Sequence, residues 1–269
     1  MKNRNESCIA IGNFDGIHIG HDALIRRMIE LSHETNRDSI IITFRFVKKD
    51  LKKSNYNIKY INSRNVKLKL LKSYSVTDIA EIELDDVISK YSPEQFIREI
   101  LIDKYNAKNI VVGYNFTFGY KAGGNVNTLR ELQDKYGYRV EEIYPVKYNG
   151  IAVSSTLVRN LLTEGKICDA NNLLINKYTI FADEINVDFN KNIAFTDNKS
   201  SIVIPADGRY RILAGSKEMM VTIRTDRNGS VLIFDKKLEK NDDIVFLDRI
   251  IWQIEDFVKI YVYKNICLW

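Results

Sequence analysis

Two of the chain's three histidines, His18 and His21, lie three residues apart in the segment IGNFDGIHIGH. Gly12, Gly16 and Gly20 flank them and allow the backbone to turn sharply and to approach a ligand closely. With a spacing close to one helical turn, the two imidazoles can point the same way and donate hydrogen bonds to phosphate oxygens without the permanent charge of a lysine. Such donors contribute most where negative charge builds in a transition state. The segment therefore predicts a phosphate site.

The neighbouring elements predict where this site lies in the fold. Residues 8–12 (CIAIG) have the pattern of a strand, and residues 22–34 have a helical pattern with Leu24, Met28 and Leu31 on one face. The histidine segment is then a strand-to-helix crossover, at the sheet edge where open α/β sheets bind ligands. Unpaired amides and the positive end of the helix favour an anion there.

Two other interpretations of the histidines are weaker. In one, both are structural residues at the entry of a helix. In the other, they are a metal-binding pair, but the third histidine, His33, lies at the far end of the predicted helix and no cysteine is close in the sequence. No metal-ligating residue is therefore predicted.

The first half of the chain alternates short β-branched runs with helical patterns, which predicts an α/β fold with a Rossmann-like parallel sheet. Ser92, Pro93 and Gln95 give one helix a capping box with proline in its first turn. The other expected strands are residues 39–44, 78–84, 109–113 and 140–146, and the other expected helices are residues 65–74, 92–105, 126–137 and 154–165.

The sequence changes character after Tyr178, where short alternating runs predict a small antiparallel β-barrel or sheet. These runs are SIVI, GRYRIL, MMVTIR, SVLIF and KIYVY. We place the domain boundary near residues 170–180, which gives a catalytic domain of residues 1–175 and a barrel domain of residues 176–269.

Composition limits the class of protein. The chain has 269 residues, 45% of them apolar, and a net charge of +5 that is spread along the sequence, which suits an anionic small molecule better than a nucleic acid. Cys8, Cys168 and Cys267 form no C-x-x-C pair, so we expect a reducing cytoplasm. We expect no membrane association, because the first residues lack a signal-peptide pattern and no apolar run approaches the roughly 20 residues that span a bilayer.

Two further motifs accompany the histidine segment: VVGYNFTFGYKAGG at residues 111–124 and VSSTLVRNLL at residues 153–162. The three together resemble the prokaryotic FAD synthetase family (riboflavin kinase/FMN adenylyltransferase), within the H-x-G-H nucleotidyltransferase superfamily. The resemblance implies a nucleotidyltransferase domain that transfers AMP from ATP to FMN and gives FAD and pyrophosphate. It also implies Mg²⁺ bound with ATP, and no covalent enzyme intermediate.

The resemblance also implies roles for particular residues. His18 and His21 would hold the ATP phosphates and stabilise the charge that develops at the α-phosphorus. Asn115 would orient substrate near the reacting phosphates. The residues expected to shape the nucleotide pocket are Gly12, Phe14, Gly20 and Gly113.

The third motif would bind the β and γ phosphates through Ser154, Ser155 and Thr156, with Arg159 adding a charged fork that matches phosphate geometry. Simple helix N-capping is the alternative for the three hydroxyl residues. For two aromatic residues of the second motif, Phe116 and Phe118, ordinary packing is an equal alternative to a role in the site.

The chain departs from the family pattern at two places. Where many members have T-F-x-P-H-P, it reads TFRFVKKDLKK, so either Arg45, Lys48 or Lys49 closes the site or this segment is a solvated basic stretch. The barrel region lacks the G-x-P-T-A-N motif of riboflavin kinases, although its segment PADGRYRI resembles the P-x-x-G-V-Y-x-V strand of the same family. We therefore predict a degenerate riboflavin-kinase-like barrel without kinase activity.

Two other functions stay open. One is a nucleotidyltransferase that acts on another phosphorylated acceptor, and the other is a catalytically idle flavin or nucleotide sensor whose barrel contacts a partner. The sequence indicates neither an oligomeric state nor a protein partner.

Overall fold

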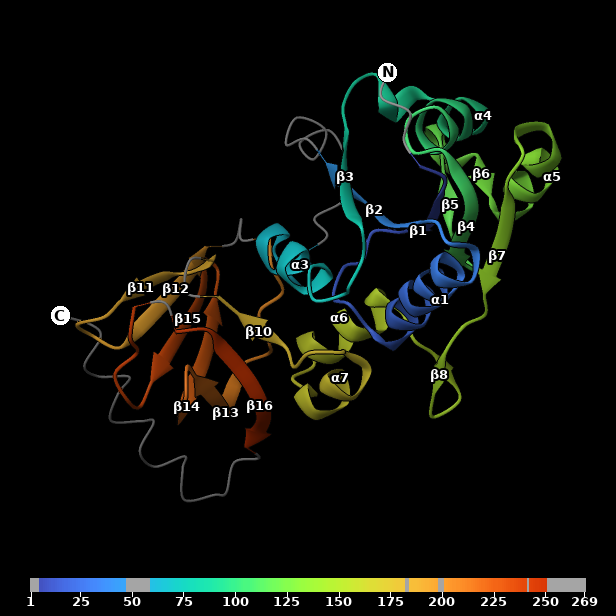
Figure 1. The fold of residues 1–269 in the computed structure, drawn as a ribbon. Coiled ribbons are helices and arrows are strands. Elements are labelled where there is room, and N and C mark those ends of the chain that lie inside the picture. Colours follow the sequence, from blue (N-terminus) through green and yellow to red (C-terminus); the bar gives the residue numbers. More distant parts are fainter. Residues whose placement is uncertain (1–4, 47–58, 182–183, 198–200, 241, 251–269) are drawn as a thin grey trace. The chain divides into compact units, whose positions relative to one another are not determined.

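The computed structural model describes residues 5–46, 59–181, 184–197, 201–240 and 242–250. The chain divides into two compact units, Met1–Ser155 and Thr156–Trp269 (Figure 1). The first unit is an α/β fold, and the second contains an antiparallel sheet preceded by helices.

The first unit is built on a five-stranded sheet in the order β3-β2-β1-β4-β7, and all neighbouring strands are parallel. This confirms the predicted Rossmann-like sheet. Since β1 pairs with β2 on one side and β4 on the other, the strand order reverses at β1, where such sheets open a crevice for ligands. The strands are β1 (Ser7–Ile11), β2 (Asp38–Phe46), β3 (Asp78–Leu84), β4 (Ala107–Gly113) and β7 (Arg139–Ile143).

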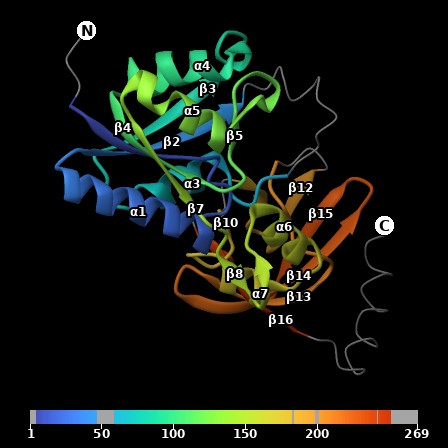
Figure 2. The ribbon, with the colours of Figure 1, turned by 90° about the vertical axis from the view of Figure 1, so that its right-hand side faces the viewer.

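Helices cover both faces of this sheet, as the views in Figures 1 and 2 show. Alternate residues of β1 point to opposite layers: Cys8 and Ala10 pack with α1 and α3, whereas Ile9 and Ile11 pack with the helical segment after β3 and with α5. Burial on both faces explains why β1 and β2 are continuous apolar runs. The helices are α1 (Ile19–Thr35), α3 (Arg64–Leu71), α4 (Pro93–Gln95), η2 (Phe96–Ile102) and α5 (Val126–Tyr136).

The segment predicted as one helix over residues 92–105 begins as expected and then changes type. Ser92 caps α4, and its side chain and that of Gln95 bond each other's backbone N–H groups, as a capping box does. The next seven residues form a π-helix that ends at Ile102. Its wider turn buries Phe96, Ile97, Ile100 and Leu101.

Short elements complete the first unit between these strands and helices. They are η1 (Ile88–Lys90), β5 (Thr117–Phe118), η3 (Tyr120–Ala122), β6 (Gly124–Asn125), β8 (Lys147–Tyr148) and β9 (Ile151–Ala152).

The second unit contains a curled, seven-stranded antiparallel sheet in the order β10-β16-β13-β14-β15-β12-β11. In the described residues its edge strands, β10 and β11, do not pair with each other, so the sheet is a half-barrel. In the core of this sheet, the rings of Tyr178 and Tyr210 pack against the ring of Phe246, with centroid distances of 5.6 and 5.7 Å. Its strands are β10 (Thr179–Ile180), β11 (Asn186–Asp188), β12 (Ile193–Asp197), β13 (Gly208–Ala214), β14 (Lys217–Asp226), β15 (Gly229–Phe234) and β16 (Ile244–Ile250).

Helices α6 (Ser155–Thr163) and α7 (Ile167–Leu173) precede this sheet. The two compact units divide after Ser155, at the start of α6, while the strands begin at Thr179. A functional boundary after residue 175 stays a prediction.

One predicted strand of the second half is wrong. In the run SIVI at residues 201–204, only Ile202 forms an isolated bridge, and no strand is present. The three apolar side chains of this run are buried by packing, without continuous pairing to a neighbouring strand. The run KIYVY at residues 259–263 lies outside the described residues, as do Lys48 and Lys49.

Candidate active site

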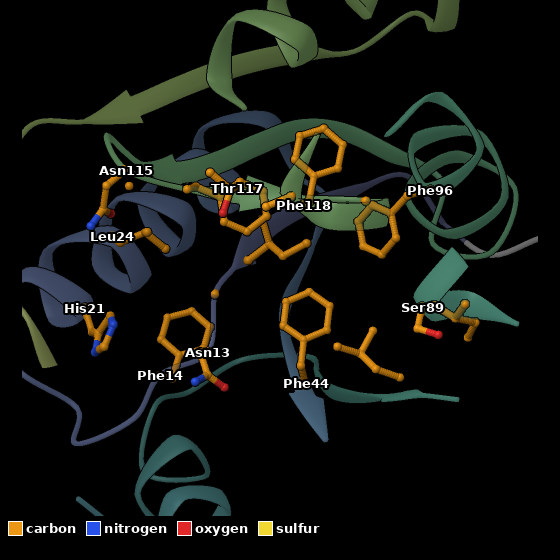
Figure 3. Close-up of a pocket in the computed structure, with 18 residues that line it drawn as sticks. Asn13, Phe14, His21, Leu24, Phe44, Ser89, Phe96, Asn115, Thr117 and Phe118 are labelled. Atoms are coloured by element: carbon orange, nitrogen blue, oxygen red, sulfur yellow. The ribbon is translucent and has the colours of Figure 1, made fainter. Parts of the chain in front are cut away.

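A pocket of about 580 Å³ opens at the carboxyl ends of β1, β2 and β4, where the strand order reverses (Figure 3). In the close-up, His21 and Asn115 lie at one end, and Ser89 and Phe96 lie at the other. The lining residues are Ile11, Gly12, Asn13, Phe14, His21, Leu24, Phe44, Leu84, Ile88, Ser89, Phe96, Gly113, Asn115, Phe116, Thr117, Phe118, Gly119 and Ala122.

His18 is the N-cap of α1, and its imidazole is fixed by the helix itself. Its Nδ1 accepts a hydrogen bond of 3.2 Å from the backbone N–H of His21. The two imidazole rings stack, with centroids 3.7 Å apart and planes 13° apart. Because Nδ1 of His18 is an acceptor, the proton of the neutral ring sits on Nε2, which is then a donor.

Burial keeps both imidazoles uncharged at neutral pH. It lowers the pKa of His18 to about 4. The pKa of His21 is lowered well below its usual value, first by burial and then by the neighbouring His18. Nδ1 of His21 is buried without a hydrogen-bond partner among the described residues. A neutral ring with an unused nitrogen can bond a ligand without carrying a charge into the pocket.

The first and last of the three glycines, Gly12 and Gly20, leave room for aromatic rings. A Cβ added at Gly20 would lie 3.2 Å from the His18 ring, and one added at Gly12 would lie 3.4 Å from the Phe14 ring. Phe14 is fully buried and has a positive φ of 51°, which is uncommon for a residue with a side chain. Its ring meets the His21 ring edge-on, at 5.2 Å.

The crossover is also tied to distant segments through Asp15, which is buried. The Asp15 carboxylate accepts from the backbone N–H of Ile61 at 2.9 Å and of Asn62 at 3.4 Å. Ser155 Oγ donates to the Asp15 carbonyl at 2.8 Å. At Gly16, where φ is +56°, a side chain would collide with Ile61. The segment before α3 and the start of α6 are thus anchored to the crossover.

The second motif lines the same pocket as the first. Gly113 ends β4, and Asn115 is exposed in the loop that follows. The rings of Phe116 and Phe118 stack at 5.5 Å, and Phe118 packs on Phe96 at 5.7 Å. Phe116 and Phe118 thus pack together and also line the pocket, and a role for them in the site stays a prediction.

The third motif spans both compact units. Ser154 and Ser155 belong to the first unit, and Ser155 is bonded to the crossover as described. Thr156 and Arg159 belong to the second unit, where Arg159 Nη1 donates to Thr156 Oγ1 at 3.4 Å. A contact of Thr156 or Arg159 with a nucleotide stays a prediction.

Several pocket residues were not predicted from the sequence. Asn13, Phe44 and Leu84 follow the ends of parallel strands or lie within them, so the rule that ligands bind at carboxyl ends could have pointed to them. Ser89, Phe96 and the other residues after β3 carry no such signal. Arg45 forms an ion pair with Glu83 on the neighbouring strand.

No three His, Cys, Asp or Glu side chains come together around a metal-sized site in the part of the chain that the structure describes. Nor does any helix of that part have the length and apolarity to cross a membrane.

A doubly wound parallel sheet, with a glycine-rich crossover and a pocket at the strand-order switch, defines an α/β protein of the class that binds ligands at this edge of the sheet. Residues 1–157 match the family model described as FAD synthetase, which is more than half of the chain. The chain belongs to the FAD synthetase family.

Individual relatives agree with this family. A bifunctional riboflavin kinase/FMN adenylyltransferase of Buchnera aphidicola is 34% identical over 180 residues, which are 66% of this chain and 58% of that protein. An FAD synthetase of Listeria monocytogenes is 27% identical over 214 residues, 80% of this chain and 84% of that protein. The matched part of this chain thus spans less than two thirds of the bifunctional relative.

A solved structure supports the fold over nearly the whole chain. It is described as a macrolide-efflux protein from Streptococcus pneumoniae and superposes with a TM-score of 0.74, covering 97% of this chain and 93% of that one. At 19% sequence identity, this likeness concerns the fold alone.

Proposed function

We propose that this chain is an FMN adenylyltransferase, which transfers AMP from ATP to FMN and releases pyrophosphate. The observation that carries the proposal is the pocket, because polar groups line one part of it and aromatic side chains line another. One end offers His21 and Asn115 for phosphates, and toward the other end Phe44, Phe96 and other apolar side chains form a wall that suits a flat aromatic ring.

The reaction requires alignment more than covalent help. An oxygen of the FMN phosphate forms a bond to the α-phosphorus of ATP, and the bond from that phosphorus to the oxygen bridging to the β-phosphorus breaks. The electron pair leaves with pyrophosphate. The protein's contribution is to hold the two phosphates in line and to stabilise the charge that develops.

We assign charge stabilisation to His18 and His21. Both rings are neutral, and the hydrogen bond at Nδ1 leaves His18 a proton on Nε2 to donate. Because a neutral donor needs no counter-charge before the substrate arrives, the pair can strengthen its hydrogen bonds as negative charge grows on the transferred phosphate.

The other predicted residues take supporting roles. Gly12, Phe14, Gly20 and Gly113 would shape the nucleotide pocket, and Asn115 would orient substrate from the facing loop. Residues Ser154, Ser155 and Thr156, together with the Arg159 guanidinium, would bind the β and γ phosphates. Because the Ser155 hydroxyl already donates its one proton to the Asp15 carbonyl, that hydroxyl would anchor the helix start, and the backbone N–H of Ser155 would be its donor to phosphate.

Mg²⁺ is proposed as a companion of ATP. The described residues offer no cluster of carboxylates that fits an ion held by the protein alone. The ion would neutralise phosphate charge when it is bound with the nucleotide. Every role above is assigned to this chain's own groups, and none depends on that ion.

The remaining features of the proposal concern the whole protein. We propose a catalytic domain of residues 1–175 and a degenerate barrel of residues 176–269 without riboflavin kinase activity. ATP and FMN are its partners, with no role for nucleic acid or a membrane. We place it in the cytoplasm, in keeping with the free thiols of Cys8 and Cys168.

The test is to incubate the purified chain with FMN, ATP and Mg²⁺ and to separate the flavins by chromatography. We expect FAD and an equal amount of pyrophosphate. Absence of FAD under varied redox and metal conditions would overturn the proposal. Pantetheine phosphate and a polyol phosphate serve as alternative acceptors, which the aromatic pocket wall disfavours.

A further inference from the structure

Lys67 is a buried lysine directly beside the pocket. It lies on α3 and is only 9% exposed. Its Nζ donates to Thr43 Oγ1 and to the Phe44 carbonyl, both at 3.1 Å, and to the Asn13 carbonyl at 3.4 Å. Lysine is seldom buried unless its ammonium group is fully paired. These three acceptors use all three of its protons and connect the ends of β1 and β2.

Charged groups surround Lys67. Burial lowers the pKa of Lys67, the carboxylates of Glu81 and Asp15 oppose this, and the nearby Arg64 adds a smaller lowering. Glu81 lies opposite Thr43 in the β2–β3 register and is bonded to Arg64. This cluster is therefore a charged support under the carboxyl edge of the sheet.

The bonds of Lys67 fix one peptide unit of the crossover. The Asn13 carbonyl accepts from Lys67 and also from Thr43 Oγ1, at 3.1 Å. That carbonyl belongs to the peptide joining Asn13 to Phe14, and the orientation of this peptide sets the φ angle of Phe14. The angle is +51°, a conformation that persists only where the surroundings hold it.

The fixed orientation of this peptide determines where the Phe14 ring lies in the site. Its ring lies over Gly12 and meets the His21 ring at 5.2 Å, and both Phe14 and His21 line the pocket. A peptide that is free to turn would release the Phe14 ring, and with it the edge-on contact between that ring and the His21 imidazole.

We propose that Lys67 is a positioning residue for adenylyl transfer: through Thr43 and the Asn13 carbonyl it holds Phe14, and thereby the imidazole of His21, in the geometry that the reaction needs. This inference rests on the proposed function. Lys67 acts through the crossover and needs no contact with substrate.

The kinetic test compares Lys67→Met with Lys72→Met. Methionine keeps the apolar stem of Lys67 but removes its donors, and Lys72 is an exposed lysine at the end of the same helix. We expect Lys67→Met to lower kcat about 10- to 100-fold with KM for ATP and FMN within about threefold, because misalignment of about 1 Å costs rate more than binding. Lys72→Met should match the wild type. A kcat for Lys67→Met within twofold of wild type would overturn the proposal.

A second variant covers the case in which Lys67→Met does not fold. Thr43→Val keeps the shape of a fully buried residue and removes only the hydroxyl between Lys67 and the Asn13 carbonyl. It should lower kcat in the same direction, with a thermal unfolding midpoint that shows the protein is folded. Unchanged kcat in folded Thr43→Val would equally contradict the proposal.

A readout independent of activity uses the chain's three histidines. In ¹⁵N-detected imidazole spectra, Lys67→Met and Thr43→Val should shift the signals of His18 and His21, while that of His33 stays in place. If the wild type makes no FAD and these signals shift, the proposed function fails, and with it the catalytic role of Lys67, while the structural link from Lys67 to the histidines stands. If the wild type makes FAD and neither kcat nor the signals change, the role of Lys67 fails alone.

Discussion

The imidazole of His18 caps the helix that carries His21 and stacks on the His21 ring, 3.7 Å from centroid to centroid. A proton on either ring would place a charge in a buried setting and against its neighbour, and the pKa values of both rings are accordingly lowered. The pair thus consists of two neutral imidazoles whose mutual orientation is set by the helix cap and the stacking.

Acid should destabilise the protein through this pair. The pKa of His18 falls from 6.5 to about 4 on folding, so between these values the unfolded chain binds more protons and stability decreases as pH falls. The contribution of His18 is complete above pH 6.5 and amounts to roughly 3 kcal/mol lost by pH 4. His18→Asn keeps an N-cap and should flatten the decline of the urea midpoint over this window. An equally steep decline in this variant would contradict the account, and His33→Asn is the control.

His21→Ala should lower kcat about 100- to 1000-fold, the usual effect of removing one donor to a developing oxyanion. KM for ATP should change much less. Steady-state rates of FAD formation measure both values. His33→Ala removes the exposed histidine at the other end of the same helix and should leave the rate unchanged. If the two alanine variants have equal rates, His21 has no role in the chemistry.

Gly20→Ala should separate stability from activity. Alanine is the better helix former by roughly 0.5–1 kcal/mol, so the thermal midpoint should hold or rise. Its Cβ would press on the His18 ring at 3.2 Å, and that ring is held between its hydrogen bond and the stacked partner. We therefore expect kcat to fall about tenfold. A variant as active as the wild type would show that the His18 position is not critical.

Phe44→Ala tests which end of the pocket receives the flavin. Loss of this ring from the pocket wall should raise KM for FMN about tenfold and leave KM for ATP unchanged, since aromatic contact of this size is worth about 1–2 kcal/mol. Separate titrations of the two substrates measure this. An increase confined to ATP would place the adenine, rather than the flavin, against Phe44.

Riboflavin should stay unphosphorylated when it replaces FMN in the assay. The prediction comes from the absence of a G-x-P-T-A-N segment in the sequence. Chromatography of the flavins after incubation with ATP and Mg²⁺ decides it, and appearance of FMN would show that the second unit is a kinase.

The alternating fold of the first unit could be predicted because strands buried on both faces leave continuous apolar runs such as residues 39–44. The π-helix over Phe96–Ile102 could not, since the same apolar residues fit an ordinary helical pattern. The short strands β11 and β12 begin or end in Asn and Asp, which gives little strand signal. The run SIVI misled because β-branched residues also pack without a strand partner.

Some residues of the candidate site could likewise be predicted from the sequence, and others could not. Both histidines and the glycines around them are local in sequence, so their spacing predicted that they lie together. Asn115 was expected at the site only because its motif resembles that of the FAD synthetase family, and it does line the pocket. Lys67 contacts Asn13 across 54 residues, and a lysine on a helix normally indicates a solvated face. Only the folded chain shows that this one is buried.

The central claim is tested most directly by following the α-phosphorus. ATP labelled with ³²P at the α position should transfer its label to a product that comigrates with FAD, in an FMN-dependent reaction that His21→Ala slows strongly. Label at the γ position should appear in pyrophosphate alone. An α label that stays in nucleotide, or enters a product containing no flavin, would contradict adenylyl transfer to FMN.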